Sequence, residues 1–402
     1  MRPVVKTALR RLWRDQTTLQ IGVHPDRALV LGGVGGRAAD LVAALDGTRD
    51  RDGLRATAQS LGLDAGVADR LIELLLAASV VDDAEAIPTA LLELSHAERD
   101  RLAPDLASAS LASGRLDAGQ STLRRRQRAR VAVIGAGRIG ATVASLLAAA
   151  GVGHIVVDDP ATCRPADCAP AGAALADTGA SRGQAAHAAV HRASGSVRTT
   201  ALRPSEHVDL VVLAPPNALD PRVHEELLRA DTPHLLATVR ETTGVIGPLV
   251  VPGASACLRC LDLHRADRDP AWPLIAAQLA TDGRRPAVQA CDVVLATLVA
   301  SVACLQALGW VDAQDAEPSV ANRPARANPP AAASRLATLG GTLELTLPDW
   351  RIRRRGWSLH PACGCHWPDP FDLADEPVDL TDHLEDHAQR RVTDAPRPDP
   401  GE

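Results

Sequence analysis

The chain has 402 residues, of which 46% are hydrophobic and 23% are charged, and its formal net charge is −6. This length predicts two or three domains, and the composition is typical of a globular protein rather than a disordered or nucleic-acid-binding one. Only 2% of the residues are aromatic, with no Tyr and one Phe, so we expect aliphatic cores and exclude aromatic platforms for stacking bases.

Acidic residues are concentrated at the end of the chain. Residues 369–402 contain eleven acidic and three basic residues, a balance of −8, whereas residues 1–368 have a balance of +2. Segments of this charge are solvated rather than packed. We therefore expect residues 368–402 to form a largely disordered acidic tail.

The sequence favours neither export nor insertion into a membrane. Residues 1–15 are rich in basic residues and contain no apolar stretch, so we expect a cytoplasmic protein. The longest apolar run, residues 287–310, is interrupted by Gln289, Asp292 and Gln306 and predicts a core or interface helix. Eight cysteines in such a chain indicate metal ligands or reactive thiols rather than disulfides.

Residues 1–82 predict a small α+β domain. Two extended segments flank the turn-forming sequence His24-Pro25-Asp26 and indicate a β-hairpin. Three helical segments follow, the last with apolar residues at helical spacing. The five elements are expected at residues 17–22, 28–31, 36–45, 52–61 and 65–79.

This order, of winged-helix proportions, resembles the PqqD-like leader-peptide recognition domains of ribosomal-peptide modification systems. The resemblance implies that an extended leader peptide binds to a sheet edge, at residues 17–22 or 28–31. A winged-helix module for dimerisation or DNA binding is the alternative for this segment alone. Residues 83–129 are expected to be a helical linker whose Arg-rich end leads into the next strand.

A nucleotide-binding signature begins at residue 130. A buried-strand run turns through Gly135, Gly137 and Gly140 into an Ala-rich helix, and Asp158 directly follows a second strand. Glycines let the backbone approach a phosphate, the helix N-terminus offers free N–H groups, and an acid about 20 residues on binds a ribose hydroxyl. We therefore predict a Rossmann-like, doubly wound α/β fold in which these four residues contact a nucleotide.

Four cysteines form two pairs that are far apart in the sequence. Two residues separate Cys257 from Cys260, and one residue separates Cys363 from Cys365. Four thiolates complete a tetrahedral zinc site and leave no position for a catalytic water. We therefore predict a structural zinc ion that holds the C-terminal end of the chain against the nucleotide-binding domain.

Taken together, these parts resemble a ThiF/MoeB-type member of the ubiquitin-activating-enzyme superfamily. The resemblance implies a ThiF-like domain over residues 130–367 with a flexible crossover at residues 312–334. It also implies a homodimer, with the helix at residues 293–308 as an interface element. The parts that follow the family order are Leu94-Ser95-x-x-Glu98, the glycine loop, Asp158, Asp177-x-Gly179, the strand at residues 208–213, and the two cysteine pairs.

Active members of this family adenylate a C-terminal carboxylate with magnesium ATP, which requires cations and a metal near the transferring phosphoryl group. Several of these groups are altered here. Pro104 replaces an Arg of the family, and residues 160–170 lack its Asn. Arg182 replaces a Lys, so that a planar guanidinium stands where the family has an ammonium group. The magnesium-organising Asp-x-x-Asp-Asn is Leu213-Ala-Pro-Pro-Asn217, and no cysteine lies between residues 261 and 290, where thioester-forming relatives have their nucleophile.

We therefore interpret the chain as a leader-peptide-binding scaffold, similar to the ThiF-like partner proteins of azole- and azoline-forming pathways. The expected partners are a precursor leader peptide and a cyclodehydratase-type enzyme, without nucleic acid or a membrane. The alternative is an active adenylyltransferase in which Gly135, Gly137, Gly140, Asp158 and Arg182 bind ATP with magnesium. A nicotinamide oxidoreductase agrees with the glycine loop but not with the cysteine pairs.

Overall fold

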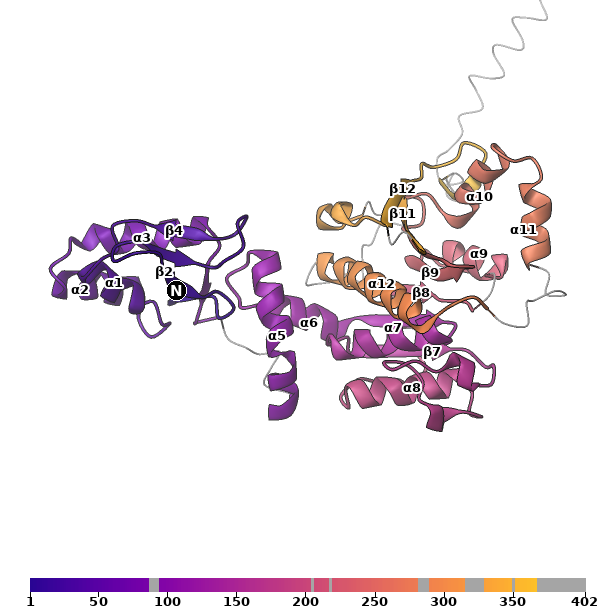
Figure 1. Ribbon diagram of the computed structural model, residues 1–402, viewed down its shortest axis with the longest axis horizontal. Helices are drawn as coiled ribbons and strands as arrows, with labels where there is room; N and C mark the ends of the chain where they lie inside the picture. The colour runs from indigo at the N-terminus through magenta and orange to yellow at the C-terminus, as the bar shows by residue number, and fades with distance from the viewer. Residues whose placement is uncertain are drawn as a thin grey trace, which may run out of the picture.

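The computed structural model describes residues 1–86, 94–203, 206–216, 219–280, 289–314, 329–348 and 351–366. Figure 1 shows an N-terminal unit at one end, an α/β body at the other, and the helices α5 and α6 between them. Of the predicted crossover, residues 312–334, the first two residues belong to a helix that ends at Ala313, residues 331–335 form a 3-10 turn, and residues 315–328 lie outside the described residues. The predicted acidic tail, residues 368–402, also lies outside them.

A seven-stranded sheet forms the centre of the body, in the order β12-β11-β10-β9-β8-β6-β7. Strands β7, β6, β8 and β9 are parallel, whereas β9, β10, β11 and β12 are antiparallel to their neighbours. The strands are β6 (Arg130–Ile134), β7 (His154–Asp158), β8 (Leu210–Leu213), β9 (His234–Arg240), β10 (Thr243–Val250), β11 (Gly341–Thr346) and β12 (Arg351–Gly356).

Helices cover both faces of this sheet. The helices α7 (Arg138–Ala149), α8 (Arg182–Ala193) and α12 (Val293–Ala313) share one aliphatic core with the strands. The helices α9 (Pro221–Arg229) and α10 (Leu258–Ala266) contribute to a smaller apolar cluster on the other face. This arrangement confirms the predicted Rossmann-like, doubly wound α/β fold.

Within the described residues, α12 is the one helix whose length and composition would let it cross a membrane. Its buried side chains, which include Leu295, Val299 and Trp310, belong to the core of the sheet. The indole N–H of Trp310 also donates to the carbonyl oxygen of Asp209 at 3.1 Å, just before β8. α12 is therefore a core helix, as the sequence predicts.

The N-terminal unit has an aliphatic core of its own. Its hairpin, β3 (Leu19–Ile21) with β4 (Leu29–Leu31), is confirmed, and so are the three predicted helices. The sequence missed three short strands, one of which places β3 in the middle of a sheet ordered β2-β3-β4. The remaining elements are β1 (Pro3–Val5), β2 (Arg11–Trp13), α1 (Arg37–Ala43), α2 (Arg51–Ser60), α3 (Ala65–Ala77) and β5 (Val81–Asp83).

This order corrects one sequence-based expectation about the peptide-binding edge. Residues 17–22 offer no free edge, because β3 pairs with β2 on one side and with β4 on the other. Of the two predicted segments, only β4 lies at an edge of the sheet.

Two helices, α5 (His96–Ser113) and α6 (Gln120–Arg128), join the N-terminal unit to the body. Lys6 on the N-terminal unit forms a buried ion pair with Asp82, at 3.1 Å, and donates to the hydroxyl of Ser110 on α5 at 2.7 Å. On the other side, Arg126 of α6 pairs with Asp312 of α12 at 2.7 Å. Charged contacts therefore attach the helical linker at both ends.

Candidate functional site

The glycine loop joins β6 to α7, as predicted. Gly135 has a φ of 90°, and a Cβ atom there would lie 2.5 Å from the carbonyl oxygen of Ala214. A Cβ on Gly140 would overlap the carbonyl oxygen of Gly135, so packing of the loop itself requires both glycines. Gly137 precedes α7, and the nearest described atom to a Cβ there is a carbon of Pro216 at 3.7 Å. Gly137 is therefore the glycine that leaves backbone N–H groups accessible to an anion.

Two acids follow one another at the carboxyl end of β7. Asp158 is exposed, and its carbonyl oxygen accepts from the N–H of Gly135 at 2.9 Å. Asp159 contacts the loop through its side chain, which accepts from the N–H of Ala136 at 2.8 Å. The predicted ribose ligand Asp158 thus lies beside the loop with its carboxylate in solvent, and its role stays a prediction.

Arg182, the predicted phosphate ligand, lies in a buried network of ion pairs. It is the first residue of α8, and only 7% of its surface is exposed. Its guanidinium lies 2.9 Å from a carboxylate oxygen of Asp167 and 3.7 Å from one of Asp159. Two buried carboxylates therefore already balance its charge, while its Nε has no hydrogen-bond partner among the described residues.

The sequence did not predict that either of these acids contacts Arg182. Asp158 and Asp159 both follow the second strand, and Asp158 was preferred as the ribose ligand only because it is the first residue after the strand. Asp167 lies in a short 3-10 turn at residues 165–167 that carries no recognised motif. Its contact with Arg182 is a tertiary contact, which no local sequence pattern predicts.

The segment after β8 is the one that differs in sequence from the magnesium-binding motif of the family. The N–H of Ala214 donates to the carbonyl oxygen of Ile134 at 2.8 Å, and Pro215 and Pro216 come next. Asn217 lies outside the described residues. Proline side chains carry no ligand atom, so Pro215 and Pro216 offer a cation only their backbone carbonyl oxygens.

The four predicted cysteines come together at one end of the sheet. The sulfur of Cys257 lies 3.6 Å from that of Cys363 and 3.8 Å from that of Cys260, and Cys260 lies 3.5 Å from Cys365. A tetrahedral zinc–thiolate site with Zn–S bonds of about 2.3 Å separates its sulfurs by about 3.8 Å. Hydrogen bonding from the Cys257 thiol holds the pKa of Cys260 far below its usual range, which favours a thiolate. The cluster therefore fits one tetrahedral metal ion.

His360 supports this cluster from outside. Its backbone N–H donates to the sulfur of Cys260 at 3.4 Å. The N–H of Ala362 donates to Nδ1 of the ring at 3.1 Å, which places the ring proton on Nε2, 2.9 Å from a carboxylate oxygen of Asp267. Although His264, Asp267 and His360 lie close enough to hold a second ion, this pattern of donors leaves His360 no lone pair for one.

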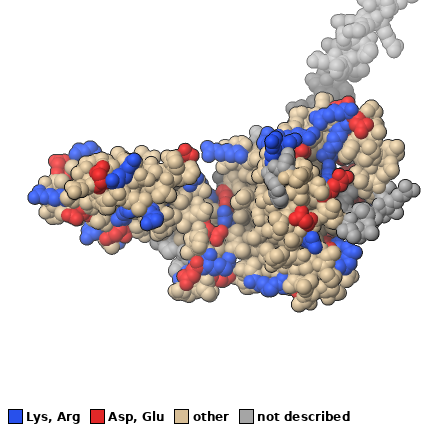
Figure 2. Space-filling view, in the orientation of Figure 1, with Lys and Arg blue, Asp and Glu red and all other residues tan. Residues whose placement is uncertain are grey.

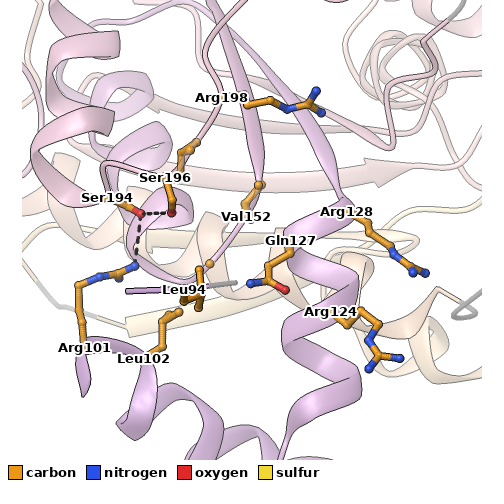
Figure 3. A pocket seen from close by; sticks show the side chains of 13 residues that line it. Leu94, Arg101, Leu102, Arg124, Gln127, Arg128, Val152, Ser194, Ser196 and Arg198 are labelled. Carbon is orange, nitrogen blue, oxygen red and sulfur yellow. Dashed lines mark hydrogen bonds between the residues drawn. The ribbon is translucent and has the colours of Figure 1, made fainter. Parts of the chain in front are cut away.

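A separate hollow of about 650 Å³ lies between the linker helices and the body (Figure 3). Arg101 of α5 crosses it, and its guanidinium donates to the carbonyl oxygen of Ala149 and to the hydroxyl of Ser194 at 3.4 Å. Gly153, which also lines the hollow, directly precedes β7. Nucleotides bind at the carboxyl ends of parallel strands, so this hollow, at their amino ends, is not the predicted nucleotide site.

Comparison with known proteins identifies the family. A model of the ThiF family matches residues 111–339, more than half of the chain. The chain belongs to the ThiF family. Among curated proteins, no sequence matches it.

Several solved structures resemble this ThiF-family chain along most of its length. Escherichia coli MccB with ATP is 14% identical, with a TM-score of 0.63, and the match covers 91% of this chain and 99% of that one. The microcin C7 biosynthetic enzyme MccB in complex with N-formylated MccA gives 14% identity, a TM-score of 0.62, and coverage of 91% and 100%. PaaA gives 15% identity, a TM-score of 0.59, and coverage of 87% and 99%. At these identities the likeness establishes the fold alone.

Proposed function

We propose that this ThiF-family chain binds the leader segment of a ribosomally made precursor peptide and presents the peptide to a cyclodehydratase-type enzyme. The N-terminal unit captures the leader, and the α/β body is a scaffold whose adenylation chemistry is eroded. Two observations support the proposal: β4 lies at the edge of its sheet, and buried acids engage Arg182. The similarity to MccB, whose structure contains a bound peptide, extends over both parts of the chain.

The backbone of β4 directs hydrogen-bonding groups toward its free edge. The N–H of Gly22 donates to the carbonyl oxygen of Arg10 at 2.8 Å, toward β2. Because backbone groups alternate in direction along a strand, those of Gln20 also point toward β2 and away from its partner on β4, Val30. The N–H and C=O of Val30 therefore point away from β3, which makes Val30 the residue to which an added strand would bind.

Replacing Val30 by proline is expected to weaken leader-peptide binding by about fivefold or more. The substitution removes the N–H that an added strand would use but spares the ladder to β3, and one such hydrogen bond accounts for about 1 kcal/mol. Val30 is 44% exposed, so the body and the core of the unit are expected to remain folded. The measurement is fluorescence anisotropy with a labelled peptide encoded by the short open reading frame that neighbours the gene of this chain.

The matched control is Val30→Ala, which shortens the same side chain and keeps the N–H. Its affinity is expected to stay within about threefold of the wild-type value. Equal losses in Val30→Ala and Val30→Pro would assign the effect to the side chain and contradict strand addition at β4. Absence of binding to the wild-type protein would contradict the proposal as a whole.

The second candidate function is adenylation, which the glycine loop and the exposed Asp158 favour. For a scaffold, we expect a calorimetric titration of the metal-loaded protein with magnesium ATP to detect no binding up to about 1 mM, a free energy of about −4 kcal/mol. Binding that Asp158→Ala weakens would instead establish nucleotide recognition and lead to a pyrophosphate-exchange assay. Asp158 is suited to this test because its exposed side chain is not required for folding.

Further parts of the proposal concern the metal, the assembly and the compartment. We propose zinc as the ion of the four-cysteine cluster, in a structural role. The outward side of α12 exposes Val294 and Leu305, which supports the expected homodimer through this helix. The described cysteines form no disulfide, in agreement with a reducing cytoplasm.

A further inference from the structure

Two of the cysteines outside the metal cluster lie together in the segment between β7 and α8. Cys163 and Cys168 are free thiols and belong to one small apolar cluster with Ala173 and Ala185. Both thiols lie against the same backbone oxygen, that of Arg164, with the sulfur of Cys163 at 3.9 Å and that of Cys168 at 3.7 Å. The two sulfurs are therefore neighbours across a short turn.

Hydrogen bonds hold both cysteines in place. The N–H of Cys163 donates to the carbonyl oxygen of Ala180 at 2.8 Å, and its own carbonyl oxygen accepts from the N–H of Gly179 at 3.0 Å. Cys168 directly follows a 3-10 turn, and its thiol also donates to the carbonyl oxygen of Ala174 at 3.3 Å. The fold of the segment itself therefore keeps the two sulfurs close to each other.

The two thiols differ in their access to solvent. Cys163 is 1% exposed, whereas Cys168 is partly exposed. Burial and, secondly, the neighbouring Cys168 thiol raise the pKa of Cys163 to about 11, so that this thiol stays protonated at neutral pH. Figure 1 shows the segment between β7 and α8 at the lower margin of the body, and Figure 2, in the same orientation, shows this margin at the surface of the molecule. Cys168 is therefore the thiol that a small oxidant in solution reaches first.

The turn between the two cysteines contains a residue of the candidate site. The carboxylate of Asp167 lies 2.9 Å from the guanidinium of Arg182 and also accepts from the N–H of Arg164 at 2.9 Å. A bond between the two sulfurs would close a small ring that contains Asp167 and restrict the turn. In the cytoplasm, disulfides are usually transient and respond to oxidants. Oxidation at this place would therefore act directly on a residue that balances the charge of Arg182.

We propose that Cys163 and Cys168 are a redox-active pair, which a small disulfide such as oxidised glutathione converts into an intramolecular disulfide. Cys168 gives its proton to solvent, attacks one sulfur of the oxidant and releases the first glutathione, which leaves a mixed disulfide on the protein. Cys163 then attacks the sulfur of Cys168, and the second glutathione leaves with the proton of Cys163. The protein loses two hydrogen atoms, and the oxidant becomes two molecules of reduced glutathione. This inference is independent of peptide capture at β4.

Mass spectrometry of tryptic peptides from the full metal-loaded chain tests this proposal. Trypsin cleaves after Arg138 and Arg182 but not after Arg164, which precedes a proline, so both thiols lie on the peptide of residues 139–182 without any other cysteine. The folded protein is incubated with oxidised glutathione and then unfolded with an alkylating agent. The peptide is expected to lose two hydrogen atoms and to carry no alkyl group, whereas after reduced glutathione it is expected to carry two. Two alkyl groups after oxidation would overturn the proposal.

Single substitutions separate the roles of the two thiols. In Cys163→Ser, Cys168 is expected to stop at the mixed disulfide, so that the peptide retains one glutathione. In Cys168→Ser, the buried Cys163 is expected to remain a thiol that takes one alkyl group and no glutathione. The matched control is Cys304→Ser, at a buried cysteine of the sheet core, which is expected to form the disulfide as the wild type does. Glutathione on Cys163 in Cys168→Ser, or none on Cys168 in Cys163→Ser, contradicts the proposal.

Discussion

Replacing Lys6 by methionine is expected to lower the free energy of unfolding of the N-terminal unit by about 3–5 kcal/mol, the cost of breaking a buried ion pair. Lys6 and Asp82 are only 2% and 5% exposed. Besides the ion pair, the ammonium donates to two carbonyl oxygens, of Ser110 and Arg115, at 2.8 and 2.9 Å. Methionine fills a similar volume but leaves the carboxylate and both carbonyl oxygens without this donor. Urea unfolding followed by circular dichroism measures the change.

A second variant distinguishes the ion pair from simple packing. Lys6→Met combined with Asp82→Leu removes both charges and is expected to recover a large part of the lost stability, because the unpaired buried carboxylate is gone. The control is Arg51→Met, which breaks a pair with Glu73 at 2.6 Å whose side chains are 36% and 63% exposed. A surface pair of this kind contributes little, so its unfolding midpoint is expected to stay close to that of wild type. An unchanged midpoint in Lys6→Met would show that the network does not stabilise the unit.

This network also illustrates what the sequence could not predict. The hairpin of β3 and β4 and the helix α3 were found from alternation, turn residues and helical spacing, which act over a few residues. Strands β1 and β5 each have three residues, too few to display a period, and they pair across nearly eighty positions. Only the folded chain brings Lys6 next to Ser110. The sequence therefore predicted a linker at residues 83–129 but not its contact with the N-terminal unit.

In the candidate site, too, the sequence predicted the features that have a fixed local spacing and not those that depend on tertiary contacts. Glycines at 135, 137 and 140 and the cysteine pairs were found because their chemistry requires a fixed spacing. The charge balance of Arg182 was not found, because Asp167 lies fifteen residues away in a turn without a motif. Motifs therefore located the loop and the metal ligands, whereas the state of the predicted phosphate ligand required tertiary structure.

Loss of the metal is expected to have the largest effect on the body. We predict one zinc ion per chain by elemental analysis. Its removal by a chelator is expected to unfold the four-cysteine cluster, which holds α10 against the segment that follows β12. Zinc binding by four ligands contributes on the order of 10 kcal/mol of folding free energy in small zinc domains. Here the cluster fixes residues 105 and 106 positions apart in the sequence, so its loss releases a long loop.

Cys363→Ser is the corresponding substitution, because Cys363 is only 1% exposed and belongs to the four-cysteine cluster. We expect the variant to lose most of its zinc and to show a lower melting temperature of the body. Peptide capture by the N-terminal unit should persist, since that unit has a separate core. The matched control is Cys304→Ser, at another buried cysteine, which packs in the core of the sheet outside the cluster. Full zinc content and unchanged melting in Cys363→Ser would contradict a structural metal held by these four residues.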